Sequence, residues 1–223
     1  MLDDTMFRIS IMLVPGLFAI TCHEVAHGAV ASYFGDPTAR MLGRLTLNPL
    51  KHIDIVGTLM LVMIGIGWAK PVPVVAENLR NPRRNMIWVS FAGPGVNMLI
   101  AGLSGALFRG VMLLYPPAGF SGVAGMVLTP VLLMLVFSIY INLLLALFNL
   151  LPIPPLDGGR IAIGILPKKL AAVLESLEPY GMIIILMLFL TKTIHPVLFP
   201  IHTKLFTWLT GGNQIQLLKP FMF

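Results

Sequence analysis

Long stretches of apolar residues constrain this chain more than any other feature of its sequence. Three of them cover residues 6–34, 85–115 and 124–151, and a fourth covers about residues 180–201. A helix needs about 20 mostly apolar residues to cross the hydrocarbon core of a bilayer. Of all residues, 57% are hydrophobic and only 11% are charged, against about 25% charged in soluble domains. The stretches therefore predict an all-α polytopic membrane protein, folded as a helical transmembrane bundle in the lipid bilayer.

The loops between these stretches are too short to hold a further folded domain. We therefore expect residues 1–223 to form a single integral membrane domain. The net charge of +6 does not indicate nucleic acid as a partner, because the basic residues lie in short loops rather than on one folded face. The positive-inside rule places the more basic loops in the cytoplasm and the amino terminus outside.

Residues 53–67 form an apolar run that is too short for a simple span and lies between basic loops. These features predict a re-entrant or interfacial segment. Before it, residues 44–48 alternate polar and apolar side chains, which is the period of a strand. After it, residues 70–74 read Lys-Pro-Val-Pro-Val, and these prolines exclude a helix. We expect a small re-entrant or interfacial β element here, after the first helix.

The first apolar stretch contains the sequence His23-Glu24-Val-Ala-His27. Residues four apart share one face of a helix, so both imidazoles can bind one Zn²⁺. Glu24 beside them can then take a proton from the zinc-bound water. A chance match is disfavoured because an acidic side chain within a span costs about 2.5 to 3.5 kcal/mol.

A catalytic zinc ion needs a third protein ligand, and most acidic residues of this chain lie in its termini and loops. Asp157 differs from them. It follows a proline-rich segment that must unwind the end of a span, and it precedes two glycines that allow close backbone approach. Irregular backbone at membrane depth is tolerated where it lines a cavity. The alternative is an ordinary surface turn.

Two asparagines and one further histidine are also candidates for the site. Asn97 lies on a line of small side chains, which favours helix packing over substrate contact, and the two roles are compatible, so Asn97 is also a candidate substrate-binding residue. The other members of that line are Gly93, Ala101 and Gly105. Asn149 adjoins the unwound segment and is better placed for catalysis. His52 lies in a basic loop, where we expect a solvated or interfacial side chain rather than a zinc ligand.

Several motifs occur together in a fixed order between about residues 23 and 180. They are His23-Glu-Val-Ala-His-Gly, Asn48-Pro-Leu-Lys-His-Ile-Asp, Gly57-Thr-Leu, Trp68-Ala-Lys-Pro-Val-Pro-Val, Ala92-Gly-Pro-Gly-Val-Asn, and Asn149 through Arg160. Together they resemble the site-2 protease family of intramembrane zinc metalloproteases. Within that family, the chain is similar to the compact prokaryotic members that lack a PDZ or CBS domain.

This resemblance implies that His23, His27 and Asp157 bind Zn²⁺ and that Glu24 is the catalytic acid and base. It also implies that Asn149 hydrogen-bonds the substrate or the developing oxyanion. The expected activity is endopeptidase cleavage in or near a transmembrane segment of another membrane protein, as in regulated intramembrane proteolysis. The expected location is a prokaryotic inner membrane, with the active site toward the cytoplasm.

Two other functions would use intramembrane histidines and an aspartate. A metal transporter needs an ion path through the membrane, and a scaffold without protease activity needs only the metal ligands. Neither requires a carboxylate beside the first ligand, so Glu24 favours the protease. The sequence specifies neither the substrate nor the oligomeric state.

Overall fold

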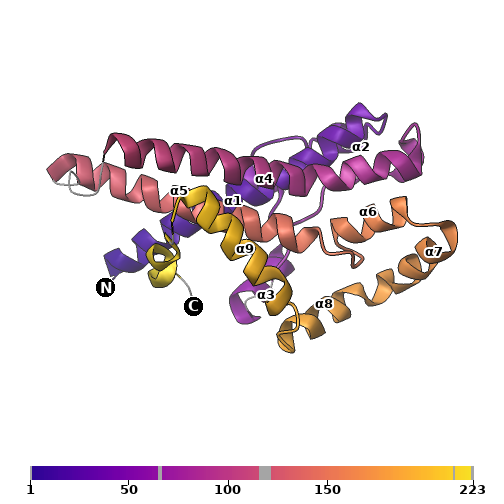
Figure 1. Ribbon diagram of the computed structural model, residues 1–223. Coiled ribbons are helices and arrows are strands. Elements are labelled where there is room, and N and C mark those ends of the chain that lie inside the picture. Colours follow the sequence, from indigo (N-terminus) through magenta and orange to yellow (C-terminus); the bar gives the residue numbers. More distant parts are fainter. Residues whose placement is uncertain (1, 65–66, 116–121, 213, 222–223) are drawn as a thin grey trace. The chain divides into compact units, whose positions relative to one another are not determined.

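The computed structural model describes residues 2–64, 67–115, 122–212 and 214–221. All regular secondary structure in these residues is helical, which confirms the predicted all-α class (Figure 1). The α-helices are α1 (Leu2–Tyr33), α2 (Thr38–Met41), α3 (Ile55–Ile64), α4 (Pro82–Leu114), α5 (Gly122–Asn149), α6 (Asp157–Ile165), α7 (Lys168–Leu177), α8 (Gly181–Leu190) and α9 (His195–Thr210). Short 3-10 helices cover Pro49–Lys51, Ala76–Asn78, Glu178–Tyr180 and Gln214–Phe221.

Four helical stretches are long and apolar enough to cross a membrane: Thr5–Tyr33, Pro82–Leu114, Gly125–Asn149 and Lys168–Leu190. The first three match the predicted spans to within a few residues. The chain is therefore a multi-pass membrane protein.

The fourth stretch differs from the prediction, which placed a span over about residues 180–201. The structure divides that region, because α8 ends at Leu190 and α9 begins at His195. Between them Lys192 has a φ of 57°, a left-handed conformation that a helix cannot continue through. The candidate span instead runs from Lys168 through α7, a 3-10 turn and α8. The tail, which the sequence left unassigned, contains α9 and the last 3-10 helix.

The helices contribute to two compact units. Unit 1 comprises Met1–Ala19, Asn97–Leu147 and Ile194–Phe223. Its core consists of apolar side chains from α1, α4, α5, α9 and the last 3-10 helix: Ile11, Ala101, Phe108, Leu132, Val136, Phe137, Ile139, Leu143, Phe206 and Leu218. Lipid tails are as apolar as these side chains, so close packing and interhelical hydrogen bonds stabilise such a core.

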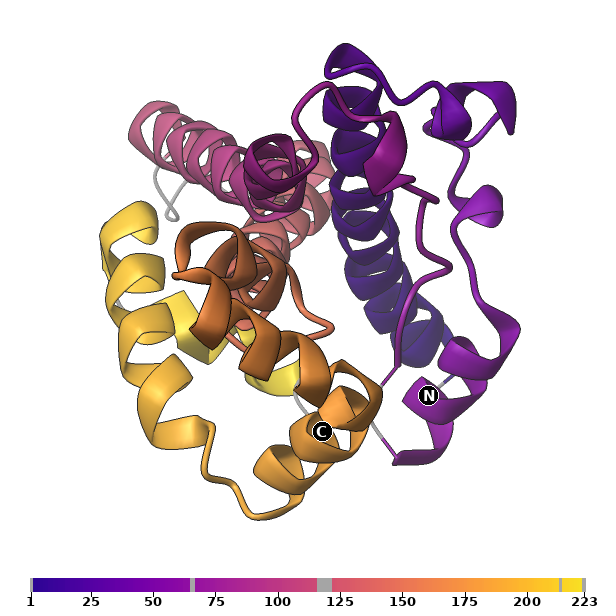
Figure 2. The same ribbon diagram turned by 90° about the vertical axis from the view of Figure 1, so that its right-hand side faces the viewer.

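Unit 2 comprises Ile20–Val96 and Phe148–Thr193, and it contains the whole candidate site. Its buried cluster centres on Ala31, Leu79 and Val89. Helix α6 lies against α4 at Gly164, where a Cβ atom would come within 2.3 Å of the Ile87 side chain. Figure 2 shows the extended segment that follows α3 alongside α1.

The predicted β element is wrong. In the described residues no strand forms after α1, and an antiparallel bridge between Ile53 and Ala69 stands alone. Residues 55–64 form α3, which at 1.5 Å per residue is about 15 Å long and too short to span. The stretch at residues 71–73, which the structure describes, lacks the free N–H groups that a strand ladder needs. The N–H of Val72 donates to the Glu24 side chain, and Pro71 and Pro73 have no N–H.

Candidate metal centre

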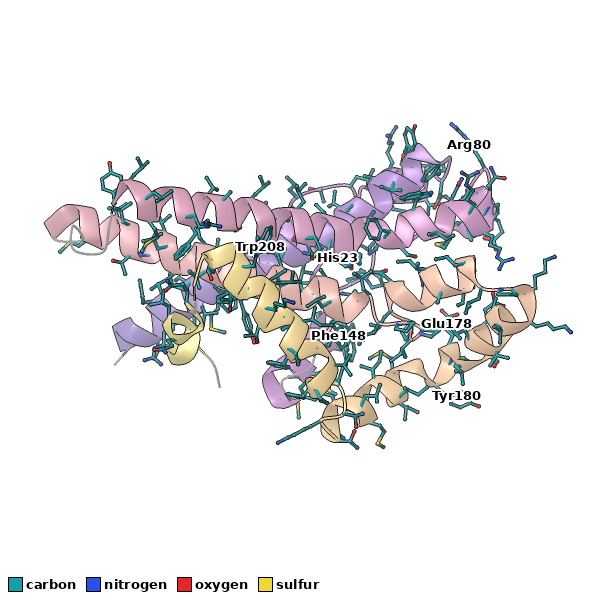
Figure 3. The ribbon with its side chains drawn as sticks, viewed as in Figure 1. His23, Arg80, Phe148, Glu178, Tyr180 and Trp208 are labelled. Carbon is teal, nitrogen blue, oxygen red and sulfur yellow. The ribbon has the colours of Figure 1, made fainter. Side chains whose placement is uncertain are left out.

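His23 and His27 lie on one face of α1, as their spacing predicted. Their rings meet edge to face with centroids 4.6 Å apart. Figure 3 labels His23 on this helix, and its side chain is buried. Together with Asp157 they are the group of side chains in the described residues that could hold a metal ion, with ligand atoms within 4.8 Å of one another.

Asp157 reaches the histidines from a different helix, because the chain unwinds after α5 and turns back. The chain is unwound over the proline-rich segment, as the sequence predicted, because α5 ends at Asn149 and α6 begins only at Asp157. The turn is tight enough that a Cβ atom on Gly158 would lie 2.3 Å from the carbonyl oxygen of Leu150. As the first residue of α6, Asp157 also places its negative charge at the positive end of a helix dipole.

The separations of the three side chains fit a tetrahedral metal ion. Asp157 Oδ2 lies 3.2 Å from His23 Nε2, and Asp157 Oδ1 lies 3.4 Å from His27 Nε2. Two ligand atoms at about 2.0 to 2.1 Å from a tetrahedral zinc ion are about 3.3 Å apart. Burial by itself would raise the pKa of Asp157, but the two imidazoles lower it to about 2, so this group is a carboxylate at neutral pH.

The tautomer of His27 supports the same conclusion. Its Nδ1 lies 2.7 Å from the carbonyl oxygen of Val89 on α4. A carbonyl oxygen only accepts hydrogen bonds, so Nδ1 carries the proton and the neutral ring has its lone pair on Nε2. That Nε2 lies 3.4 Å from Asp157 Oδ1, so the same atom donates to the carboxylate when it is protonated and can bind a metal ion when its lone pair is free. Metal-binding histidines commonly donate their second nitrogen in this way.

Glu24 lies beside the three candidate ligands but has its own partner. Its Oε2 accepts a hydrogen bond of 2.8 Å from the backbone N–H of Val72. This bond orients the carboxylate and leaves Oε1 available to take a proton. The arrangement suits an acid and base rather than a ligand.

The extended segment that carries Val72 is held against α1 at two further points. Gly28 lies one turn after Glu24, and a Cβ atom there would come within 2.8 Å of the Val72 side chain and 2.6 Å of Leu45. Asp36, after the end of α1, accepts a hydrogen bond of 2.8 Å from Val75 N–H. The sequence indicated neither contact, because it placed Asp36 among ordinary loop acids. The Gly-Asp pair directly after the apolar helix is the signal that could have marked this site.

The remaining predicted residues fall into two groups. Asn97 is fully buried in unit 1 and donates to Asn142 Oδ1 at 2.7 Å and to the carbonyl of Ala19 at 3.2 Å. These bonds join neighbouring helices, and contact of Asn97 with substrate stays a prediction. Asn149 is the last residue of α5, and its contact with substrate stays a prediction.

The sequence predicted a solvated or interfacial side chain for His52, but in the structure this side chain is buried. It is 2% exposed, and its Nε2 lies 2.9 Å from the carbonyl oxygen of Thr46. Its backbone carbonyl also accepts from Lys70 N–H. The expectation of a solvated side chain was wrong, because His52 links the loop before α3 to the segment after it and is buried there.

Residues 11–190 match the family model described as peptidase family M50. This match covers most of the chain, including every residue of the candidate metal centre. The chain therefore belongs to peptidase family M50, and it is a zinc metalloprotease of that family.

Named relatives agree with this assignment. The chain is 41% identical over 191 residues to the Bacillus subtilis protein named "Putative zinc metalloprotease YwhC", a match that covers 85% of this chain and 84% of the relative. It is 30% identical over 195 residues to "Putative zinc metalloprotease Rip2" of Mycolicibacterium smegmatis, covering 83% and 69% of the two chains. Rip2 of Mycobacterium tuberculosis H37Rv is 29% identical over 205 residues, covering 88% and 73%. No solved structure matches the chain.

Proposed function

We propose that this protein is an intramembrane zinc endopeptidase that cleaves a peptide bond in or near a transmembrane segment of another membrane protein. The observation that carries the proposal is the position of His23, Glu24 and His27 within a candidate span, with Asp157 against both histidines. At 1.5 Å per residue, His27 lies about 9 Å from the end of α1 at Tyr33. A site at this depth acts on chains that are themselves in the membrane.

His23 Nε2, His27 Nε2 and one oxygen of Asp157 would hold the zinc ion. When bound, zinc supplies a Lewis acid that polarises the scissile carbonyl and lowers the pKa of its bound water toward about 7. Val89 keeps His27 in the tautomer whose Nε2 can bind, and α6 keeps Asp157 in reach.

Glu24 would transfer the protons of the reaction. With Oε2 held by Val72 N–H, its other oxygen accepts a proton from the attacking water. The same carboxyl group then donates that proton to the leaving amine, so no net proton remains on the enzyme. Asn149 is proposed to hydrogen-bond the substrate carbonyl as negative charge develops on it.

The substrate must present its backbone in an unwound form. A transmembrane helix uses its carbonyl and N–H groups in internal hydrogen bonds, so a cleavable bond becomes accessible only where the helix opens. We therefore expect substrates with helix-breaking residues such as glycine or proline near the cleavage point.

The test is Glu24→Gln in purified protein, with cleavage of single-span membrane proteins and zinc content both measured. Gln has the shape of Glu, and its carbonyl oxygen can still accept from Val72 N–H, but it cannot take a proton. We expect cleavage to be abolished and zinc to be retained. Glu77→Gln is the matched control, because Glu77 is exposed in a 3-10 turn of the same unit. Retained cleavage in Glu24→Gln would refute the proposal, and loss of zinc would make Glu24 a ligand.

A further inference from the structure

Helix α4 passes the two histidines at Gly93 with no room for a side chain. A Cβ atom added to Gly93 would lie 2.4 Å from His27 Nε2 and 2.6 Å from His23 Nε2, nearer than Cβ atoms come to other atoms in proteins. These two nitrogens are the candidate metal-binding atoms. Because zinc lies about 2.0 to 2.1 Å from an imidazole nitrogen, a methyl group at position 93 would occupy space that the metal ion needs.

We propose that Gly93 belongs to the metal centre, where its missing side chain keeps the coordination space beside His23 and His27 open. The inference rests on the proposed zinc site and adds α4 as a wall of that site. Gly93 is a positioning residue, since it supplies space rather than a ligand atom.

Two features of α4 support this assignment over ordinary helix packing. Gly102 and Gly110 of the same helix have open space where a Cβ atom would lie, whereas Gly93 has none. Where glycine serves close packing of helices, the atoms opposite it are those of the neighbouring backbone. The nearest atoms opposite Gly93 are imidazole atoms alone.

The second feature is the residue one turn earlier. Val89 and Gly93 are four apart, so they share one face of α4. The Val89 carbonyl sets the tautomer of His27, and Gly93 leaves room at the nitrogen that this tautomer frees. One helix face therefore both orients a ligand and clears the space that the ligand points into.

Gly93→Ala tests the proposal, with Gly102→Ala as the matched control. Gly102 lies on the same helix, and a Cβ atom there would meet nothing within 4 Å. We expect wild type and Gly102→Ala to bind zinc, and Gly93→Ala to bind it at least about 10-fold more weakly, a loss of the size caused by other disturbances around metal ligands. Zinc affinity is measured by chelator competition, and Co²⁺ absorption reports whether the tetrahedral geometry survives.

A second measurement separates crowding of the imidazoles from misfolding. In a His23→Ala/His27→Ala background the rings are gone, so Gly93→Ala should leave the melting temperature unchanged or raise it. Gly93→Ala protein that binds zinc with wild-type affinity would overturn the inference, and so would loss of folding in the double-alanine background. Wild-type protein that binds no zinc would instead refute the proposed function.

Discussion

Replacing Asp36 with asparagine is expected to loosen the segment that holds Glu24. Asp36 is fully buried, and its carboxylate accepts four hydrogen bonds. Oδ1 accepts from Thr38 N at 3.1 Å, Thr38 Oγ1 at 2.5 Å and Asn78 Nδ2 at 3.1 Å, while Oδ2 accepts from Val75 N at 2.8 Å. The last two bonds tie residues 75–78 to the end of α1, three residues beyond the N–H that Glu24 accepts.

The size of the effect follows from the hydrogen-bonding groups. An asparagine has one acceptor oxygen, which can serve Thr38 and Asn78 in place of Oδ1. Its NH₂ group then faces Val75 N–H, so two donors oppose each other and that bond is lost. A hydrogen bond to a charged group contributes about 1.5 to 3 kcal/mol. At about 2 kcal/mol, opening of this segment becomes roughly 30-fold more frequent.

Hydrogen exchange measured by mass spectrometry checks this prediction on the protein in detergent micelles. Amides of residues 72–79 should exchange roughly 30-fold faster in Asp36→Asn. Asp54→Asn is the control, because Asp54 Oδ1 accepts from Gly57 N at the start of α3 and asparagine caps a helix as well as aspartate does. Cleavage should also fall while zinc is retained. Unchanged exchange over residues 72–79, or equal effects of the two substitutions, would refute this account of Asp36.

The same carboxylate predicts a pH dependence. Burial by itself would raise the pKa of Asp36, but the hydrogen bonds from Thr38, Val75 and Asn78 outweigh it and lower the pKa below its ordinary value. A lowered pKa stabilises the folded protein fully above the unfolded value of about 3.9, and this contribution is lost as pH falls from there through the lower pKa of the folded state. Between pH 5 and pH 3 the melting temperature of wild type should therefore fall more steeply than that of Asp36→Asn. Parallel curves for the two proteins would exclude this contribution.

Two further predictions concern the ligands and the orientation in the membrane. Asp157→Ala should weaken zinc binding by about 10-fold or more, whereas His52→Ala should lower the melting temperature and leave zinc binding intact. Zinc affinity and thermal unfolding of both variants check this. Loss of zinc in His52→Ala but not in Asp157→Ala would show that the ligands proposed here are wrong. In a Cys22→Ala background, a membrane-impermeant thiol reagent applied to intact cells should label a cysteine at position 118, which lies outside the described residues, and should not label one at position 81; the reverse pattern would invert the proposed orientation.

Much of the metal centre could be predicted from sequence because three of its residues lie close together in one helix. The spacing of His23, Glu24 and His27 places them on one face of α1 whatever surrounds that helix. Apolar length likewise predicted three spans to within a few residues, because the thickness of the bilayer sets how long a span must be. The unwound approach to Asp157 was visible for a similar reason, since the closely spaced Pro152, Pro154 and Pro155 remove several of the N–H donors that a helix needs.

The rest depended on residues far apart in the chain. Alternating side chains before α3 and the prolines after it suggested a β element, but no pattern within those segments shows that Glu24 takes the N–H of Val72. The sequence placed Asp36 among the acids of the loops, and only the folded chain brings Val75 and Asn78 against it. His52 was misjudged in the same way, since its burial comes from the segment after α3.

The features that could be predicted differ from those that could not for one physical reason. Periodicity and length act within a single element, so the sequence alone determined the three longest spans and the side chains of α1 that share a face. A hydrogen bond or a close approach between elements depends on how distant parts of the chain pack. Only the tertiary structure could decide that Asp157 meets both histidines, that Val89 sets the His27 tautomer, and that Gly93 leaves room beside them.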